Sequence, residues 1–217
     1  MQLLLKRPVI PQDEFDRLLN SANTEASLQK VHQLNEFFSA NRMSFRVQTS
    51  RCPYTENAFV GLAYPSNPTL PTSYSLIERE YFTKILKFII SNDEFVSTKL
   101  VPLDPLLTLG STLSRTTSTA DLLTFLALFV TDSLLYLQSN EQGDYYGLGP
   151  RSMIQWSNLI SDNCELCLMC QEHLFTGLKC FYCSCVMHRN CFEEFLANRA
   201  QNNVISCPQC RQNFHGP

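Results

Sequence analysis

The sequence predicts an α+β fold built from three successive parts, and three observations support this. Amphipathic helices followed by two short candidate strands occur twice in succession. A proline-rich connector at 64–73 holds three prolines in ten residues. Cys52 stands alone in the first 160 residues, whereas the other nine cysteines fall between Cys164 and Cys210. We therefore expect parts near residues 1–70, 71–158 and 159–217.

Composition and charge narrow the class of protein. The chain has 217 residues, 44% of them apolar, and a formal net charge of −3, so it can build real cores and is not a globally basic nucleic-acid binder. The apolar run in 1–8 is too short for a signal-peptide core. The most apolar stretch, 122–137, is broken by polar residues and is shorter than the roughly 20 residues of a membrane span. We expect a soluble intracellular chain whose thiols stay reduced.

The first part has the pattern of a winged helix. Pro11 is expected to open a helix with Phe15, Leu18 and Leu19 at helical spacing. A strand is expected at 44–48, where apolar and polar residues alternate, and a second candidate strand follows at 58–62. A second helix between these elements is capped by Asn23 or Thr24 and has an apolar face formed by Leu28, Val31, Leu34, Phe37 and Phe38.

The second part repeats this order. An apolar helical face is formed by Ile77, Tyr81, Ile85, Phe88 and Ile89. Pro102 and Pro105 then break the chain, and Asp104 or Ser111 is expected to cap the next helical segment. Asp121 precedes a long apolar helix that is expected to continue through Leu137. Gly143 predicts the turn of a hairpin wing, and 152–159 is expected to form a short helix that carries Trp156.

Winged helices suggest DNA binding, but the residues do not favour it here. A helix that reads DNA needs exposed basic or amide side chains, and the candidate recognition segment 111–128 offers only Arg115. Arg42, Arg46 and Arg51 lie near the first ribbon and could contact phosphate, although a solvated surface is the simpler interpretation. We expect these parts to dock protein rather than to read DNA.

The cysteine-rich part predicts two zinc ions. A pair of ligands separated by two residues can place both donors on one ion, and eight ligands make two closed tetrahedral sites. Disulfides or reduced core cysteines are the weaker explanation. Four such pairs are present: Cys167/Cys170, Cys180/Cys183, His188/Cys191 and Cys207/Cys210.

One ambiguity of register concerns Cys180 and Cys185. The spacing Cys183-x-Cys185-x2-His188-x2-Cys191 is common in RING fingers and would leave Cys180 unused. We prefer Cys180-x2-Cys183-x4-His188-x2-Cys191, which preserves a Cys-x2-Cys pair. In that register Cys164 and Cys185 are spare thiols or occasional substitute ligands. His173 and His215 are expected at the surface, and Cys52 in a core.

The zinc part resembles a cross-braced RING variant of the C4HC3 type. This resemblance implies that the first and third pairs share one zinc, whereas the second and fourth share the other. Together with two winged-helix parts and the segment Leu148-Gly149-Pro150-Arg151, the chain resembles the RING-bearing "non-SMC element one" subunit of the SMC five–six chromosome complex. The resemblance implies ubiquitin-ligase activity in DNA repair and recombination in the nucleus. It also implies a MAGE-like and a kleisin partner, with DNA reached mainly through the complex.

The resemblance also indicates how such a domain would work. Closed zinc sites cannot activate water, so a RING positions a ubiquitin-conjugating enzyme and its thioester rather than attacking it. The expected contacts with that enzyme are Leu168, Met169, Pro208 and Arg211, with Arg211 positioning ubiquitin. A histone reader is disfavoured because the zinc part has no tryptophan for an aromatic cage, and Phe192, Phe195 and Leu196 have the spacing of a helix core. The serious alternative is a non-catalytic scaffold whose zinc domain only docks neighbouring subunits.

Overall fold

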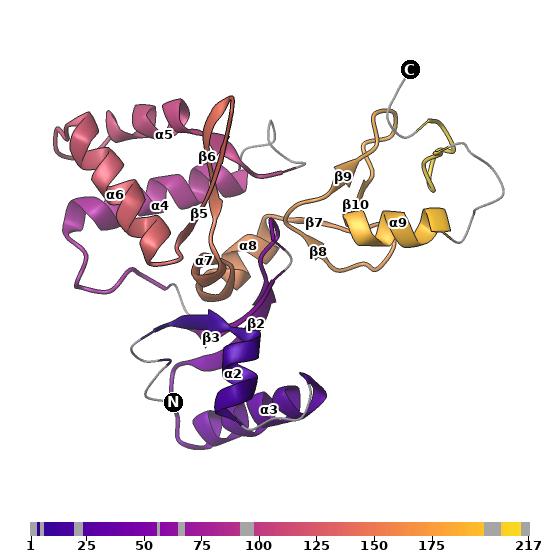
Figure 1. Ribbon diagram of the computed structural model, residues 1–217, viewed down its shortest axis with the longest axis horizontal. Helices are drawn as coiled ribbons and strands as arrows, with labels where there is room; N and C mark the ends of the chain where they lie inside the picture. Colours follow the sequence, from indigo (N-terminus) through magenta and orange to yellow (C-terminus); the bar gives the residue numbers. More distant parts are fainter. Residues whose placement is uncertain are drawn as a thin grey trace. The chain divides into compact units, whose positions relative to one another are not determined.

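The computed structural model describes residues 4, 7–19, 24–55, 57–64, 68–91, 98–197 and 205–213 (Figure 1). The chain forms two compact units, one of residues 1–89 and 100–159 and a smaller one of residues 90–99 and 160–217. Asn23 and His215, and the middle of the proline-rich connector, lie outside the described residues. Within those residues, no helix is both long and apolar enough to cross a membrane.

The first half of the larger unit is a small winged helix. Its antiparallel sheet has the order β1-β3-β2, with Ile10 opposite Val60 and Val47 opposite Leu62. The strands expected from the sequence are confirmed, and β1 is an additional strand. Pro11 ends β1 and lies at the N-cap position of α2. The elements are β1 (Val9–Pro11), α2 (Gln12–Leu18), α3 (Thr24–Ala40), β2 (Arg46–Arg51) and β3 (Ala58–Ala63).

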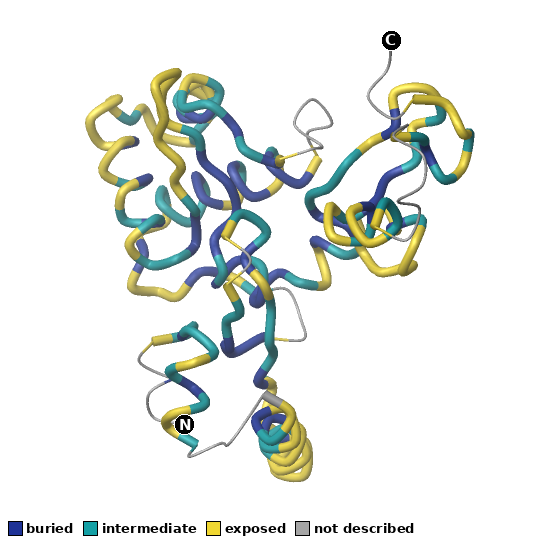
Figure 2. The backbone as a smooth tube through the Cα atoms, turned by 45° about the vertical axis from the view of Figure 1, so that its right-hand side comes forward, coloured by how far each residue is buried: buried dark blue, intermediate teal, exposed yellow. Residues whose placement is uncertain are grey.

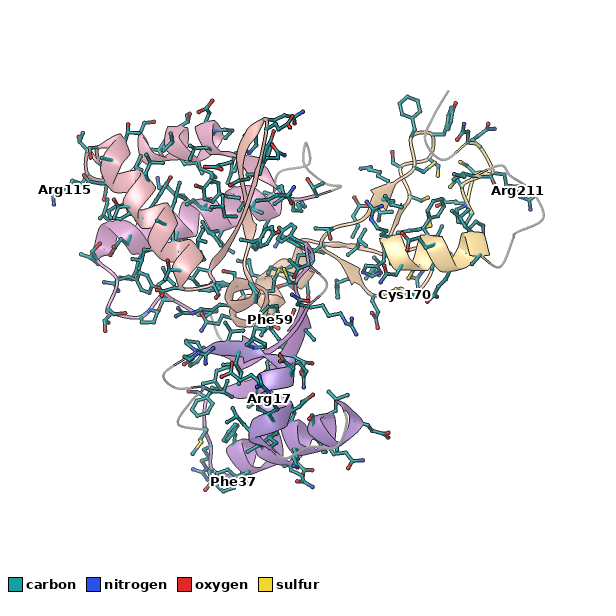
Figure 3. The ribbon with its side chains drawn as sticks, viewed as in Figure 1. Arg17, Phe37, Phe59, Arg115, Cys170 and Arg211 are labelled. Atoms are coloured by element: carbon teal, nitrogen blue, oxygen red, sulfur yellow. The ribbon has the colours of Figure 1, made fainter. Side chains whose placement is uncertain are left out.

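The core of this half uses fewer helix residues than the sequence pattern suggests. Phe15, Val31 and Phe38 are buried against Ile10, Val47, Val60 and Leu62. Leu18, Leu28 and Phe37 are 56%, 48% and 57% exposed, so they lie outside the core although the pattern groups them with the apolar residues of their helices. Figure 3 shows Phe37 at the outer side of α3. One face of the three-stranded sheet is too small to cover every apolar side chain of α2 and α3.

The second half of the larger unit repeats the same topology. Its sheet has the order β4-β6-β5, which matches β1-β3-β2 strand for strand. The predicted hairpin is confirmed: its turn is at residues 141–142, and Gly143, at φ +128°, follows the turn and pairs with Asn140. Helices α4, α5 and α6 pack together beside this hairpin (Figure 1). The elements are α4 (Leu76–Ser91), β4 (Val101–Pro102), α5 (Leu103–Gly110), α6 (Thr119–Thr131), β5 (Leu135–Asn140) and β6 (Gly143–Leu148).

Helix α6 differs from its predicted bounds at both ends. It ends at Thr131 rather than Leu137, because Ser133 adopts φ 57° and Leu134 N–H returns to the Phe129 carbonyl at 2.8 Å. Its N-cap is Ser118, whose Oγ accepts from Asp121 N–H at 3.1 Å. Helix α5 has Pro102 at its N-cap and Ser111 at its C-cap, so the predictions that Asp104 or Ser111 caps the start of the following helix are wrong.

Two short helices follow the hairpin where one was predicted. Helix α7 (Pro150–Gln155) and helix α8 (Ser157–Asp162) are separated at Trp156, which is buried. Arg151 is also buried, and its guanidinium donates to the Tyr74 hydroxyl, which in turn donates to Asp132. This network satisfies a buried charge beside the end of α6.

The smaller unit has little regular structure. Its strands are two residues long and pair as β7–β8 and β9–β10. Buried residues form short stretches between exposed loops (Figure 2). Leu174, Val186, Met187 and Phe192 share their core with three cysteines, and Phe195 and Leu196 pack against it as predicted. The elements are β7 (Glu165–Leu166), β8 (His173–Leu174), β9 (Leu178–Lys179), β10 (Val186–Met187) and α9 (Arg189–Ala197).

Candidate metal centres

Three Cys-x2-Cys segments of the smaller unit have the same backbone turn. In the first, Gln171 N–H donates to the Cys167 carbonyl at 2.9 Å, and Cys167 N–H donates to the Glu172 carbonyl at 2.9 Å. In the second, Ser184 N–H donates to the Cys180 carbonyl at 3.0 Å and Cys180 N–H to the Cys185 carbonyl at 2.8 Å. These reciprocal bonds close each segment into a knuckle that sets the positions of its two cysteines.

The third knuckle, at Cys207, repeats both bonds. Arg211 N–H donates to the Cys207 carbonyl at 2.9 Å, and Cys207 N–H to the Gln212 carbonyl at 2.8 Å. The residue after the second cysteine is left-handed in all three knuckles, with φ 60° at Gln171, 58° at Ser184 and 61° at Arg211. Residues other than glycine adopt this region at a cost. All three residues are exposed, and the backbone of the knuckle sets the direction in which each side chain leaves it.

The first centre gathers Cys167, Cys170, His188 and Cys191. Their donor atoms all lie within 4.8 Å of one another. The His188 Nδ1 atom is 3.3 Å from Cys170 Sγ and 3.9 Å from Cys191 Sγ. These values lie either side of about 3.6 Å, the sulfur–nitrogen edge of a tetrahedron built with ordinary zinc–ligand lengths. This set of three thiols and one imidazole therefore fits a tetrahedral zinc ion.

The second centre holds one thiol more than four ligands require. The sulfurs of Cys180, Cys183, Cys185 and Cys207 all lie within 4.8 Å of one another. Cys210 Sγ lies 3.7 Å from Cys180 Sγ, and Cys183 Sγ lies 3.7 Å from Cys207 Sγ. A tetrahedral zinc–thiolate site has sulfur–sulfur edges of about 3.8 Å. The structure thus brings Cys210 to Cys180 as expected, but the four sulfurs that all lie within 4.8 Å of one another include Cys185, treated as spare in the sequence, in place of Cys210.

The pairs that form the two centres alternate along the chain. The first centre takes its donors from the first knuckle and from His188/Cys191, and the second takes its donors from the knuckles at Cys180 and Cys207. Neither centre can form without bringing distant segments together, which makes the domain cross-braced. Each set closes a four-ligand shell, so a metal ion here supports the fold and activates no water.

Backbone donors prepare two thiols for metal binding. Burial disfavours the Cys167 thiolate, but N–H groups of Cys170, His188 and Met169 outweigh it and lower its pKa to about 6. At Cys207, N–H groups of Cys210 and Gln209 likewise outweigh burial and lower the pKa to about 6. Burial and neighbouring thiols raise the pKa of Cys191 to about 12. One thiol of each centre therefore ionises more readily than an ordinary cysteine, which favours binding of a cation.

The expected contacts for a conjugating enzyme lie on two knuckles. Met169 is 43% exposed, whereas Leu168 is half-buried and its N–H donates to the Val186 carbonyl at 2.9 Å. Pro208 is half-buried in the third knuckle, and Arg211 follows it, exposed at the surface (Figure 3). These residues belong to the backbone framework of the metal centres, which fixes where they point.

The remaining candidates are apart from the metal centres. Among the described residues Cys164 joins neither metal group, His173 is exposed, and Cys52 is buried as predicted. Arg115 extends from the turn before α6 (Figure 3), and α6 itself has no lysine or arginine. Three arginines of the first half that were considered for phosphate contact are exposed and lie on or before β2: Arg42, Arg46 and Arg51.

Fold and site together define a tandem winged-helix protein with a cross-braced metal-binding domain. A chain of the solved structure "Nse1-Nse3-Nse4 complex" has the same fold, with a TM-score of 0.74 and 17% sequence identity over 100% of this chain and 94% of that one. A second structure, a conserved hypothetical protein from Chlorobium tepidum, covers 70% of this chain and 94% of that one, at 10% identity and a TM-score of 0.25. No family model and no curated protein sequence matches the chain.

Proposed function

We propose that this chain is an Nse1-type subunit of an SMC five–six chromosome complex and a RING-type ubiquitin ligase with two structural zinc ions. The observation that carries the proposal is the alternation of ligand pairs between two four-donor centres. That arrangement stands within a full-length likeness to a chain of the Nse1-Nse3-Nse4 complex. The winged helices alone would not support it, because that fold serves many functions.

The proposed catalysis is positioning. Met169 and Leu168 on the first knuckle and Pro208 on the third offer apolar contact to a conjugating enzyme. Arg211 donates to the enzyme and to ubiquitin, holding the thioester in a conformation that an amine can attack. No side chain of this chain forms a covalent intermediate, and the zinc ions only hold the two knuckles in register.

The larger unit, which contains both winged helices, is proposed to bind the MAGE-like partner. The kleisin is proposed as a further subunit of the complex. Leu28 and Phe37 leave large apolar side chains exposed on α3, which a protein partner would cover. The shortage of basic residues on α6 supports protein docking over direct DNA reading. DNA repair in the nucleus would then follow from membership of the complex.

A thioester-discharge assay with Arg211→Asn tests the ligase proposal. Asparagine tolerates the left-handed backbone at this position, so the knuckle is kept while the guanidinium is removed. Loss of charge-assisted hydrogen bonds worth about 1.5–3 kcal/mol should slow discharge by about 10- to 100-fold. Ser184→Asn is the matched control, because Ser184 holds the same backbone position in another knuckle.

The assay is run on the full chain with and without the MAGE-like partner, and zinc content is measured in each variant. The proposal requires slow discharge by Arg211→Asn at full zinc content and ordinary discharge by Ser184→Asn. If neither the wild type nor Arg211→Asn stimulates discharge in either condition, the zinc domain is a docking module and the scaffold hypothesis is correct.

A further inference from the structure

The second metal centre presents five cysteine sulfurs, one more than a tetrahedral ion binds. In the described part of the chain, the first centre has four donors. At the second centre, Cys185 Sγ lies 3.4 Å from Cys207 Sγ, closer than either 3.7 Å contact within the expected quartet. A thiol at this distance is inside the volume that the ligands of one ion occupy.

Two different quartets of sulfurs can be drawn around this centre. In the first, Cys180–Cys210 and Cys183–Cys207 are opposite edges of a tetrahedron, and both measure 3.7 Å. In the second, Cys185 replaces Cys210, and all four sulfurs lie within 4.8 Å of one another. The quartets share Cys180, Cys183 and Cys207, so they differ only in the fourth ligand.

The position of Cys185 is set by the same backbone that holds the other ligands. Its carbonyl accepts the Cys180 N–H at 2.8 Å and so closes the second knuckle. The next two residues, Val186 and Met187, are buried in β10. Cys185 is therefore a half-buried thiol held against the centre from a structured segment.

We propose that Cys185 and Cys210 are alternative fourth ligands of the second zinc ion. Exchange breaks the zinc bond to the Cys210 sulfur and forms one to the Cys185 sulfur, while the proton on the Cys185 thiol passes to the released Cys210. The ion keeps four thiolates throughout and nothing is oxidised. The inference uses the zinc of the proposed function but is independent of ligase activity.

Zinc counting on serine variants of the full chain tests this directly. Cys210→Ser should keep two zinc ions per chain, because Cys185 completes the shell. Cys170→Ser is the matched control, since Cys170 is the second cysteine of a knuckle at the centre with four donors, and it should keep one. Cys185→Ser should keep two, and the double variant of Cys185 and Cys210 should keep one.

Absorption spectra of the Co²⁺-bound chain give a second measurement, which does not depend on how much zinc each variant retains during purification. The metal-free chain is titrated with Co²⁺, and tetrahedral d–d and thiolate charge-transfer bands are followed. Cys210→Ser should keep the charge-transfer intensity of the wild type, and the double variant should lose the part due to the second centre. Loss of one metal by Cys210→Ser overturns the proposal. Retention of two by Cys170→Ser or by the double variant also overturns it, because a fourth thiolate would then be dispensable.

Discussion

The two units of the chain are held together by different physical means. In the larger unit, strands of up to six residues pack under helices, and the core is made of aliphatic and aromatic side chains such as Phe38, Tyr81 and Phe129. In the smaller unit, each strand is only two residues long. Three cysteines lie in its core. The difference shows that burial of apolar surface can explain the first fold but leaves the second dependent on metal.

Removal of metal should have the largest effect and should be confined to one unit. Structural zinc contributes on the order of 10 kcal/mol in small zinc domains, more than the few apolar residues of this core can replace. With a chelator present, amide hydrogen exchange on the full chain should show loss of protection over residues 164–197 and 205–213. Protection in α4, α6 and β3 should remain. Equal loss of protection in both units would show that the larger unit also depends on metal.

A core truncation in the larger unit should have the next largest effect. The Phe129 ring is fully buried and its centroid lies 5.3 Å from that of Phe82, edge to face. Phe129→Ala should lower the free energy of unfolding of the larger unit by about 3–5 kcal/mol, measured by denaturant titration. Phe181→Ala is the contrasting variant, because this ring is 69% exposed on a knuckle and its loss should cost no more than about 0.5 kcal/mol. A large cost at Phe181 would mean that aromatic packing also stabilises the smaller unit.

Sequence patterns located the elements of the larger unit better than their ends. Alternation located β2, and Gly143 located the hairpin, because period and turn chemistry are local properties. The predicted C-terminal end of α6 was wrong because the segment 122–137 is predominantly apolar. Helix and buried strand look alike there, and the left-handed Ser133 that separates them has no strong sequence signal.

The sequence predicted the ligand pairs of the metal centres but not the positions of the individual sulfur atoms. Spacing groups Cys167 with Cys170 and His188 with Cys191, yet it cannot say whether Cys180 or Cys185 is used. That depends on where the second knuckle places each sulfur, and the structure places both at the centre. The left-handed position shared by Gln171, Ser184 and Arg211 was also missed, because none of them is glycine.

The smallest expected effect on stability comes from the N-cap at the start of α6, and it tests whether the two units are stabilised separately. Ser118 Oγ accepts from Asp121 N–H at 3.1 Å and donates to the Asp121 carboxylate at 2.7 Å, so it satisfies a helix N-terminus. Ser118→Ala should lower the free energy of unfolding by about 1 kcal/mol, and Ser118→Asn should restore most of it because asparagine is an equally good cap. If the two units owe their stability to separate causes, the lost cap shifts the denaturant midpoint of the larger unit and leaves zinc affinity unchanged. A fall in zinc affinity in Ser118→Ala would show instead that the helix and the metal centres unfold as one.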